Sequence, residues 1–381
     1  MESIRITLLT IFAGLVFIPP LARRLGLPVI VAELIYGIVL GVSFLNLIPR
    51  EEQVIEFFSC FGLVYLMFVV GLETDFGAIY REGYLKQAVA VASASLLLPF
   101  AAGAAISYMV DVHPMLMGTI FCTTSIGLIL PLLKDVSCSR KFSQTLVGSV
   151  VFVDIISIFL LAFVLAGTEG SIGAEFFYGL LAMLILLLLP WILSRKGFHK
   201  KVKARVVKEG HFDIEIRIAF AVIFSLAAAS SFLGFHAIIG AFIAGLIVSE
   251  IIPSHARQHL QSFGYGFFIP LLFILIGAEV NLPLLFSSAN NIAILAVIVV
   301  VALLSKACSV TVANRLIGFS RMESLASGIF HGARLSLIIA VAEVSRGLDL
   351  IGENLFSSLV ILAIISAIVA PAIGKRILSR A

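Results

Sequence analysis

Long runs of apolar residues, separated by short polar breaks, follow one another along the whole chain. Most of these runs contain about 20 residues, the length that an α-helix needs to cross the hydrocarbon core of a bilayer. The pattern therefore predicts an all-α polytopic membrane protein with 13 transmembrane helices. Their expected bounds are 6–22, 27–47, 54–72, 86–109, 114–133, 143–166, 173–194, 214–233, 236–252, 262–280, 289–313, 321–345 and 353–375.

The composition agrees with this class of protein. Hydrophobic residues fill 61% of the 381 positions and charged residues only 13%, against about 25% charged residues in a typical soluble domain. The sequence contains no phosphate loop, nucleophile elbow or metal motif, so we expect neither an enzyme nor a bound cofactor. The four cysteines show no disulfide or zinc spacing, and we interpret them as small core residues: Cys60, Cys122, Cys138 and Cys308.

The lysines and arginines are distributed unevenly between the two sides of the predicted helices. The breaks after odd-numbered spans, with the C-terminal tail, carry 20 of the 26, and the other side carries Arg5, Arg50 and Arg346. The positive-inside rule then places the N-terminus outside and the C-terminus in the cytoplasm, and we expect the inner (plasma) membrane. The net charge of +4 therefore reflects membrane topology, and we expect no nucleic acid as a partner.

Two basic segments need an interpretation of their own. The first apolar run lacks a basic leader and is followed by Arg23 and Arg24, so we interpret it as a span and not as a cleavable signal. The longest polar break contains seven lysines and arginines within 195–208. We interpret it as a topogenic cytoplasmic loop; the alternative is a contact with lipid headgroups or a regulatory partner.

Two charged residues lie in the middle of predicted spans. Asp154 stands in "VVFVDIISIF" and Lys306 in "VVVALLSKACSV", each about three turns from the ends of its span. A charge in the bilayer interior is costly, and it usually pairs with another charge or lines a transport pathway. The two residues therefore form either a structural ion pair within the bundle or part of a transport site.

Two further spans carry polar interruptions at mid-membrane. "GTIFCTTSIGLILPLLKD" contains Thr123, Thr124 and Ser125, and "SGIFHGARLSLIIAVAEV" contains His331 and Arg334. Hydroxyl groups and glycines satisfy or expose backbone groups where a membrane helix unwinds. Corresponding interruptions in the two halves of a chain point to the binding site of an inverted-repeat transporter. We therefore predict two crossed broken helices, within repeats made of spans 4–6 and 11–13.

The remaining polar residues in or beside the spans are open to two interpretations each. We favour a structural role over a cation funnel, a secondary ion site or a pH sensor for these residues: Glu33, Glu73, Asp75, His236, His331 and Glu343. Arg334 is the exception, because its charge can offset the like-signed dipole ends that meet where two broken helices cross.

Five segments, in order, resemble the motifs of a known family. They are "RLGLPVIVAELIYGIVLGVS", "LGLVYLMFVVGLETDF", "LGFHAIIGAFIAGLIVSE", "FGYGFFIPLLFILIGAEVNL" and "LLSKACSV". Together they are similar to the monovalent cation:proton antiporter superfamily, in the branch of the Kef-type potassium efflux systems and the Nap-type sodium/proton exchangers.

The resemblance implies an NhaA-like antiporter fold in two functional parts. Residues 1–80 and 214–285 would form a scaffold through which two copies make a homodimer. Residues 86–166 and 289–375 would form the core that carries the ion, and 173–213 would hold the linker helix and the basic loop. Kef-type relatives continue into a soluble regulatory domain, and since this sequence stops at Ala381 we expect a short form or a shortened chain.

The resemblance also implies roles for single residues. Asp154 matches the carboxylate that cation and proton share, Lys306 the lysine of span 11, and Arg334 a basic position beside the broken span. One position departs from the family, because the polar residue that usually precedes the aspartate is replaced by Val153. This departure favours electroneutral exchange, and it leaves Lys306 to pair with Asp154 or with a group that the sequence does not reveal.

These features predict a secondary antiporter that exchanges a monovalent cation, Na⁺ or K⁺, for a proton. Burial penalises the charged form of a carboxyl group and a nearby lysine favours it, so one site can hold either ion. The expected cation ligands are oxygens from Asp154, Thr123, Thr124, Ser125, unwound backbone and water. The alternatives are a Kef-like gated K⁺ efflux channel and a sensor without transport built on an antiporter scaffold.

Overall fold

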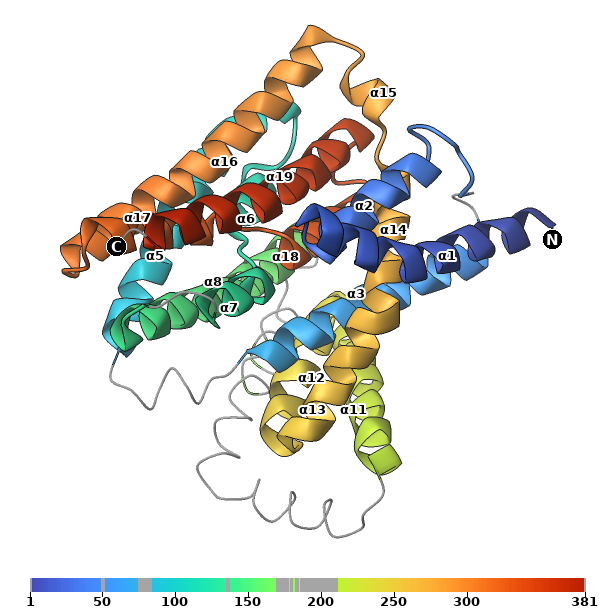
Figure 1. Cartoon of the computed structure of the whole chain (residues 1–381), viewed down its shortest axis with the longest axis horizontal. Coiled ribbons are helices and arrows are strands. Elements are labelled where there is room, and N and C mark those ends of the chain that lie inside the picture. The colour runs from blue at the N-terminus through green and yellow to red at the C-terminus, as the bar shows by residue number, and fades with distance from the viewer. Residues whose placement is uncertain are drawn as a thin grey trace. The chain divides into compact units, whose positions relative to one another are not determined.

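A computed structural model describes residues 2–48, 52–74, 84–134, 138–168, 178, 181, 185 and 212–379. Throughout these residues the regular secondary structure is helical, with no strand (Figure 1). The predicted seventh span, the linker and the basic loop at 195–208 lie outside the described residues, apart from three isolated positions. The count of 13 spans therefore stays a prediction.

The helices follow the predicted spans closely. The longer ones are α1 (Glu2–Leu25), α2 (Val29–Leu40), α3 (Gln53–Glu73), α5 (Leu85–Val110), α8 (Arg140–Thr168), α11 (Phe212–Phe232), α12 (Ala237–Ile251), α16 (Ala289–Leu316) and α19 (Glu353–Leu378). Within the described residues, nine helical stretches are long and apolar enough to cross a membrane. They include Ser254–Glu279 and Arg321–Gly347 but not α2 and α12, which are shorter. The chain is thus a multi-pass membrane protein.

Two of the predicted boundaries are wrong. The second span was expected to continue to residue 47, but α2 ends at Leu40, because Gly41 adopts an extended conformation and Asn46 turns the chain back with a φ of 48°. The tenth span was expected to begin at 262. Instead α13 (Ser254–Phe263) runs through a π-helical turn, η1 (Gly264–Phe268), into α14 (Ile269–Glu279). Hydropathy alone does not predict α13, because its sequence is polar.

The two interrupted spans are broken as predicted. The first consists of α6 (Pro114–Cys122) and α7 (Ile126–Lys134), with residues 123–125 non-helical between them. The second consists of α17 (Arg321–His331) and α18 (Ser336–Gly347). The N-terminus of each first half is stabilised: Pro114 occupies the first turn of α6, and Ser320 and Glu323 form a capping box on α17.

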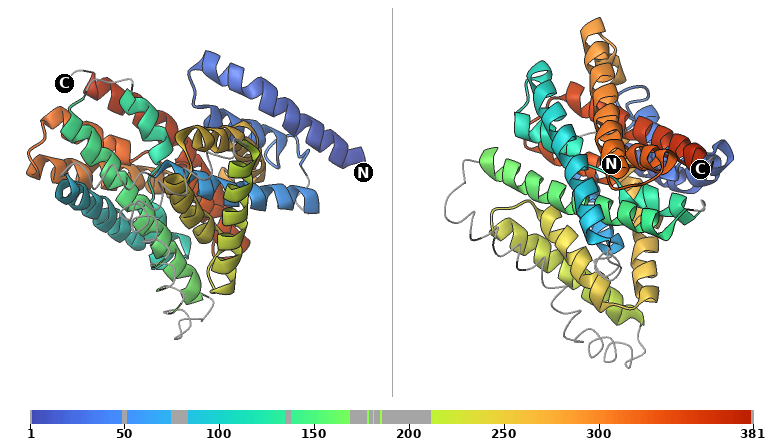
Figure 2. Two further views of the ribbon diagram at one scale, coloured as in Figure 1. Left: turned by 90° about the horizontal axis from the view of Figure 1, so that it is seen from below. Right: turned by 90° about the vertical axis from the view of Figure 1, so that its left-hand side faces the viewer.

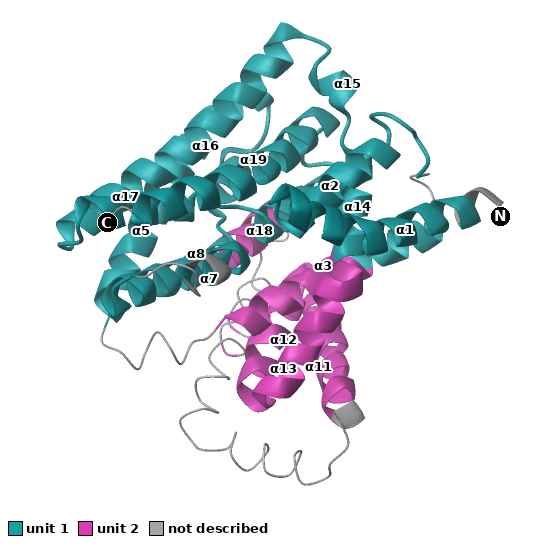
Figure 3. Ribbon diagram, in the orientation of Figure 1, with its two compact units in different colours: residues 1–60, 83–157, 270–381 teal, residues 61–82, 158–269 magenta. Residues whose placement is uncertain are grey.

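The described residues form two compact units (Figure 3). The first unit consists of residues 1–60, 83–157 and 270–381. In it, α5 packs on α6 and on α16, α16 packs on α17, and α17 packs on α19 (Figures 1 and 2). Both halves of this unit thus repeat one order of elements, a long helix, a broken helix and a long helix. A short helix that the sequence did not predict, α15 (Leu282–Leu285), precedes the second set.

The second unit consists of residues 61–82 and 158–269. Here α3 and α12 approach so closely that a methyl group on Gly71 would collide with the main-chain oxygen of Phe242. An aromatic cluster made by Phe61, Tyr65 and Phe268 lies earlier on α3, and the Tyr65 hydroxyl donates a hydrogen bond to the Leu260 carbonyl at 2.9 Å. Close backbone contact and interlocking rings stabilise this unit by packing.

Candidate functional site

Asp154 lies at the middle of α8, in the first unit, and only 1% of it is exposed. Of the described side chains in α5–α8 and α16–α19, it is the one buried carboxylate. Within the described residues, no three His, Cys, Asp or Glu side chains gather as a multivalent metal site would require. The arrangement therefore offers a single buried negative charge, which suits a proton or one monovalent cation.

Val153, the neighbour of Asp154, is fully buried in an apolar cluster with Ala92, Leu96 and Cys122. The cluster joins α8 to α5 and to the last residue of α6. An apolar side chain at this position packs α8 against the first broken helix and supplies no hydrogen bond to Lys306.

Lys306, in α16, is fully buried, and its ammonium group has three oxygen partners. Nζ donates to the Cys122 carbonyl at 2.6 Å, to Ser95 Oγ at 2.9 Å and to Thr124 Oγ1 at 2.9 Å. A lysine ammonium has three donors, so these partners use all of them. The partner that the sequence did not reveal is thus a set of neutral oxygens from α5 and the first break.

The position of Lys306 also balances charge at the break. Cys122 is the last residue of α6, and the carbonyls at a helix C-terminus carry partial negative charge that a cation stabilises. Cys122 also packs against Val153, the neighbour of Asp154. Lys306 therefore bonds the end of α6 at the place where this half-helix packs against the helix that carries the buried carboxylate.

The three predicted hydroxyl ligands are all buried in the non-helical segment between α6 and α7. Thr123 Oγ1 donates to the Ile120 carbonyl at 2.8 Å, and Thr124 Oγ1 donates to the His331 carbonyl at 3.5 Å. A hydroxyl oxygen that donates one hydrogen bond keeps lone pairs for a cation, although Thr124 already accepts from Lys306. The Thr124–His331 contact also shows that the two breaks lie side by side.

Arg334 lies in the second break and is fully buried. Ser366 of α19 holds its backbone from both sides, accepting from Arg334 N at 3.1 Å and donating to Arg334 O at 2.8 Å. The guanidinium donates to the Ala302 carbonyl at 2.9 Å and lies 5.6 Å from the centre of the Phe121 ring. These contacts join α16, α19 and the end of α6 to the unwound segment.

His331, the last residue of α17, has partners on both ring nitrogens. Nδ1 lies 2.8 Å from the Ser327 carbonyl, and Nε2 lies 2.9 Å from Ser149 Oγ. Ser149 belongs to α8, so this contact ties the second broken helix to the helix that carries Asp154. Both residues are fully buried.

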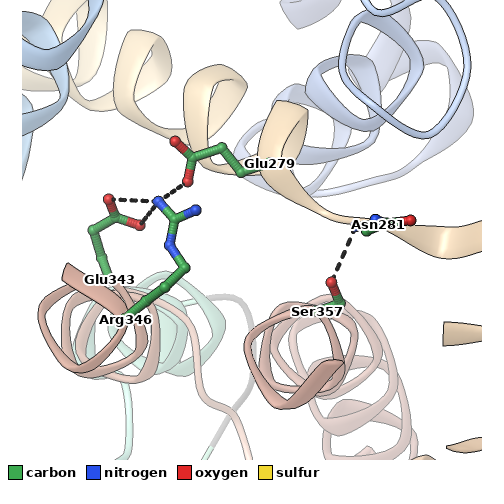
Figure 4. Close-up of polar contacts among 5 residues, drawn as sticks. All are labelled: Glu279, Asn281, Glu343, Arg346 and Ser357. Atoms are coloured by element: carbon green, nitrogen blue, oxygen red, sulfur yellow. Dashed lines mark hydrogen bonds and ion pairs between the residues drawn. The ribbon is translucent and has the colours of Figure 1, made fainter. Parts of the chain in front are cut away.

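The structure does not bring Glu343 to this site. Its carboxylate accepts from Arg346 Nη2 at 3.2 Å, and the same guanidinium pairs with Glu279 at the end of α14 (Figure 4). In the same view Asn281 N donates to Ser357 Oγ at 3.0 Å, which connects the segment after α14 to α19.

The structure shows the surroundings of two other acids from the sequence analysis. Glu73, in the second unit, accepts from the Tyr265 hydroxyl at 2.9 Å. Glu33 is buried in α2, and its Oε2 has no hydrogen-bond partner among the described residues. Asp75 lies outside the described residues.

Sequence reasoning missed three serines that hold this site together: Ser95, Ser149 and Ser366. Each is a small polar residue within an apolar span, and this is the signal that could have drawn attention to them. Serines in membrane helices commonly bond to their own helix, however, so the signal does not separate these three from others such as Ser93.

Comparison with known proteins gives a consistent result along the whole chain. The family described as "Sodium/hydrogen exchanger, transmembrane" matches residues 8–380. The solved structure of the sodium proton antiporter MjNhaP1 from Methanocaldococcus jannaschii has the same fold, with a TM-score of 0.64 at 17% identity, covering 99% of this chain and 98% of that one.

Curated relatives of similar length match as well. A probable Na⁺/H⁺ antiporter 3 of Methanocaldococcus jannaschii is 27% identical, covering 99% of this chain and 97% of the relative. The Na⁺/H⁺-K⁺ antiporter GerN of Bacillus cereus is 27% identical, covering 93% and 91%. A Na⁺/H⁺ antiporter of Enterococcus hirae is 25% identical, covering 93% of each chain.

Proposed function

Since the chain belongs to the sodium/hydrogen exchanger family, we propose that it exchanges Na⁺ for H⁺ by alternating access, with both ions competing for Asp154. The observation that carries this proposal is the buried Asp154 on α8, whose neighbour Val153 packs against Cys122, the residue that Lys306 bonds at the end of α6. An uncompensated carboxylate penalises movement through the membrane interior, whereas one neutralised by a proton or a cation does not. Competition for the one site then couples the two fluxes.

We propose that the exchange is electroneutral. Na⁺ and H⁺ each bring one positive charge to Asp154 when they bind. Loading Asp154 with either Na⁺ or H⁺ gives the same total, so the two loaded forms cross the membrane with equal charge. All three Lys306 donors are engaged, which supports a lysine that keeps its protons during the cycle.

The cation ligands in this proposal are oxygens. Asp154 supplies the charged one, and Thr123, Thr124 and Ser125, unwound backbone carbonyls and water supply the neutral ones. A hard monovalent cation prefers such ligands, and the broken helix exposes backbone oxygens that a continuous helix would use internally.

Several wider features belong to the same proposal. Residues 1–80 and 214–285 act as the scaffold of a homodimer, and 86–166 and 289–375 as the moving core. The N-terminus lies outside and the C-terminus in the cytoplasm, supported by the 20 basic residues on one side.

The protein acts as a transporter and not as an enzyme. The mass of the purified protein in detergent, corrected for bound detergent, tests the dimer.

The test of the transport mechanism is cation-driven proton flux in proteoliposomes with an imposed pH gradient. Asp154→Asn removes the charge at nearly constant volume and should abolish exchange. Asp111→Asn is the matched control, because Asp111 is exposed at the end of α5, and asparagine tolerates its left-handed conformation (φ 52°). It should exchange like the wild type.

The remaining outcomes separate the alternatives. Exchange by Asp154→Asn at the wild-type rate would overturn the role of Asp154. Downhill cation flux through the wild-type protein without proton coupling would favour a channel. No flux through a correctly folded wild-type protein would favour a sensor. Li⁺, Na⁺ and K⁺ are assayed in parallel, because the name of one relative, GerN, includes K⁺.

A further inference from the structure

His331 contacts two elements that each contribute to the proposed cation site. Its main-chain oxygen accepts from Thr124, in the first break, and its ring Nε2 contacts Ser149 on α8. Ser149 precedes Asp154 by five residues, which is about 7.5 Å along a helix. One residue thus links the segment of the hydroxyl ligands to the helix of the carboxylate ligand.

The protons in this contact can be assigned from the chemistry of the partners. The Ser327 carbonyl can only accept, so Nδ1 of His331 carries a proton. A second proton would put a charge on a fully buried ring, and burial disfavours the charged form of a histidine. The ring is therefore neutral, and Nε2 accepts a hydrogen bond from the Ser149 hydroxyl.

In this assignment Ser149 donates to His331 Nε2, and a second acceptor competes for the same proton. Ser149 Oγ also lies 2.8 Å from the Leu146 carbonyl of its own helix, and a hydroxyl has one proton to donate. When the proton goes to His331, it bonds α8 to α17. When it goes to Leu146, the serine bonds only within α8. The His331 ring is what makes the bond between the helices available.

We propose that His331 is a positioning residue that determines ion selectivity, by holding α8 through Ser149 at a fixed distance from the first break. Cations of different radius require different spacings between their oxygen ligands, and here those ligands lie on two separate elements. Without the bond between Ser149 and His331, Asp154 can shift relative to residues 123–125, and the preferred radius changes. This inference rests on the proposed function.

The experiment measures half-saturating concentrations for Li⁺, Na⁺ and K⁺ in the same proteoliposomes. Ratios between ions do not depend on how many molecules are active, so a loss of folded protein alone leaves them unchanged. Ser149→Ala removes the donor, and His331→Asn removes the acceptor while keeping a side-chain amide near the Ser327 carbonyl. Each should change at least one ratio by about three- to tenfold, the effect of one buried hydrogen bond.

Two further variants make the test specific. The double variant should change the ratios no more than either single one, because both remove the same bond. His331→Gln restores an acceptor near the place of Nε2, so its ratios should return toward the wild type. Ser143→Ala, in the first turn of the same helix, is the control and should leave the ratios unchanged.

Wild-type ratios in both Ser149→Ala and His331→Asn would overturn the inference, and so would additive changes in the double variant. Failure of the proposed function looks different, because it appears as exchange by Asp154→Asn whatever the ion ratios of the other variants. The two ideas are therefore tested separately by one set of liposomes.

Discussion

The ammonium nitrogen of Lys306 lies 2.6 Å from the main-chain oxygen of Cys122, the last residue of the half-helix α6. A buried cation thus meets the negative end of a helix dipole, where the break has left carbonyl groups without helical partners. The role that this geometry gives to Lys306 is to stabilise the unwound segment. It does not require Lys306 to exchange a proton.

Replacing Lys306 tests that role. Lys306→Gln has two donors in place of three and no charge, so at least one buried oxygen should lose its partner. We expect a loss of about 1–3 kcal/mol in the free energy of unfolding, seen as a lower melting temperature in detergent. Exchange in proteoliposomes should persist at a reduced rate. A variant that melts like the wild type but transports nothing at any pH would identify Lys306 as an obligatory proton carrier.

Ser95 offers a finer test of the same contacts. Ser95→Ala removes one of the three acceptors of Lys306 and should destabilise the protein by about 1–3 kcal/mol, because a buried ammonium donor is left unsatisfied. Ser93→Ala is a matched control two residues earlier, since Ser93 is exposed and its hydroxyl donates to the Val89 carbonyl of its own helix. Equal melting temperatures for the two variants would contradict the structural role of the Ser95–Lys306 bond.

Electroneutrality predicts the response to voltage. Asp154 is the single buried carboxylate of the described core helices, and Val153 beside it is packed in an apolar cluster. Initial rates should therefore be the same with and without a potential imposed by K⁺ and valinomycin in Na⁺-loaded liposomes. Currents on a solid-supported membrane should stay near the empty-liposome level. A steady current that rises with turnover would rule out exchange of one cation for one proton.

Arg346 holds two carboxylates together at the C-terminal ends of α14 and α18 (Figure 4). Arg346→Gln should leave Glu279 and Glu343 repelling each other, with a loss of about 1–2 kcal/mol in stability, between the values for exposed and buried pairs. Its contact with the Phe356 ring at 4.4 Å is lost as well.

A second substitution separates these two effects. The double variant Glu279→Gln with Arg346→Gln should recover part of the lost stability, because the repulsion is gone while the ring contact is still missing. Melting temperatures measured in a double-mutant cycle report the coupling. Additive losses would show that Glu279 and Arg346 contribute independently.

Most of the helical architecture could be predicted from the sequence. A membrane span must be apolar over about 20 consecutive residues, so its location is a local property of the chain. The breaks were also visible locally, because Thr123, Thr124 and Ser125 interrupt one apolar run and His331 and Arg334 another. The exceptions were the early end of α2, the short helix α15, and α13, whose polar sequence resembles a loop until the helix is seen to continue into α14.

The sequence by itself determined the class of protein, the order of the helices and the buried carboxylate, because a charge within an apolar run stands out wherever the run folds. Only the tertiary structure decided which groups meet that charge. Lys306 and its partners Ser95 and Cys122 are about 200 residues apart, and one of those partners is a carbonyl, a group that every residue has. The packing and rotation of the helices selects among such groups, so no local pattern could have singled them out.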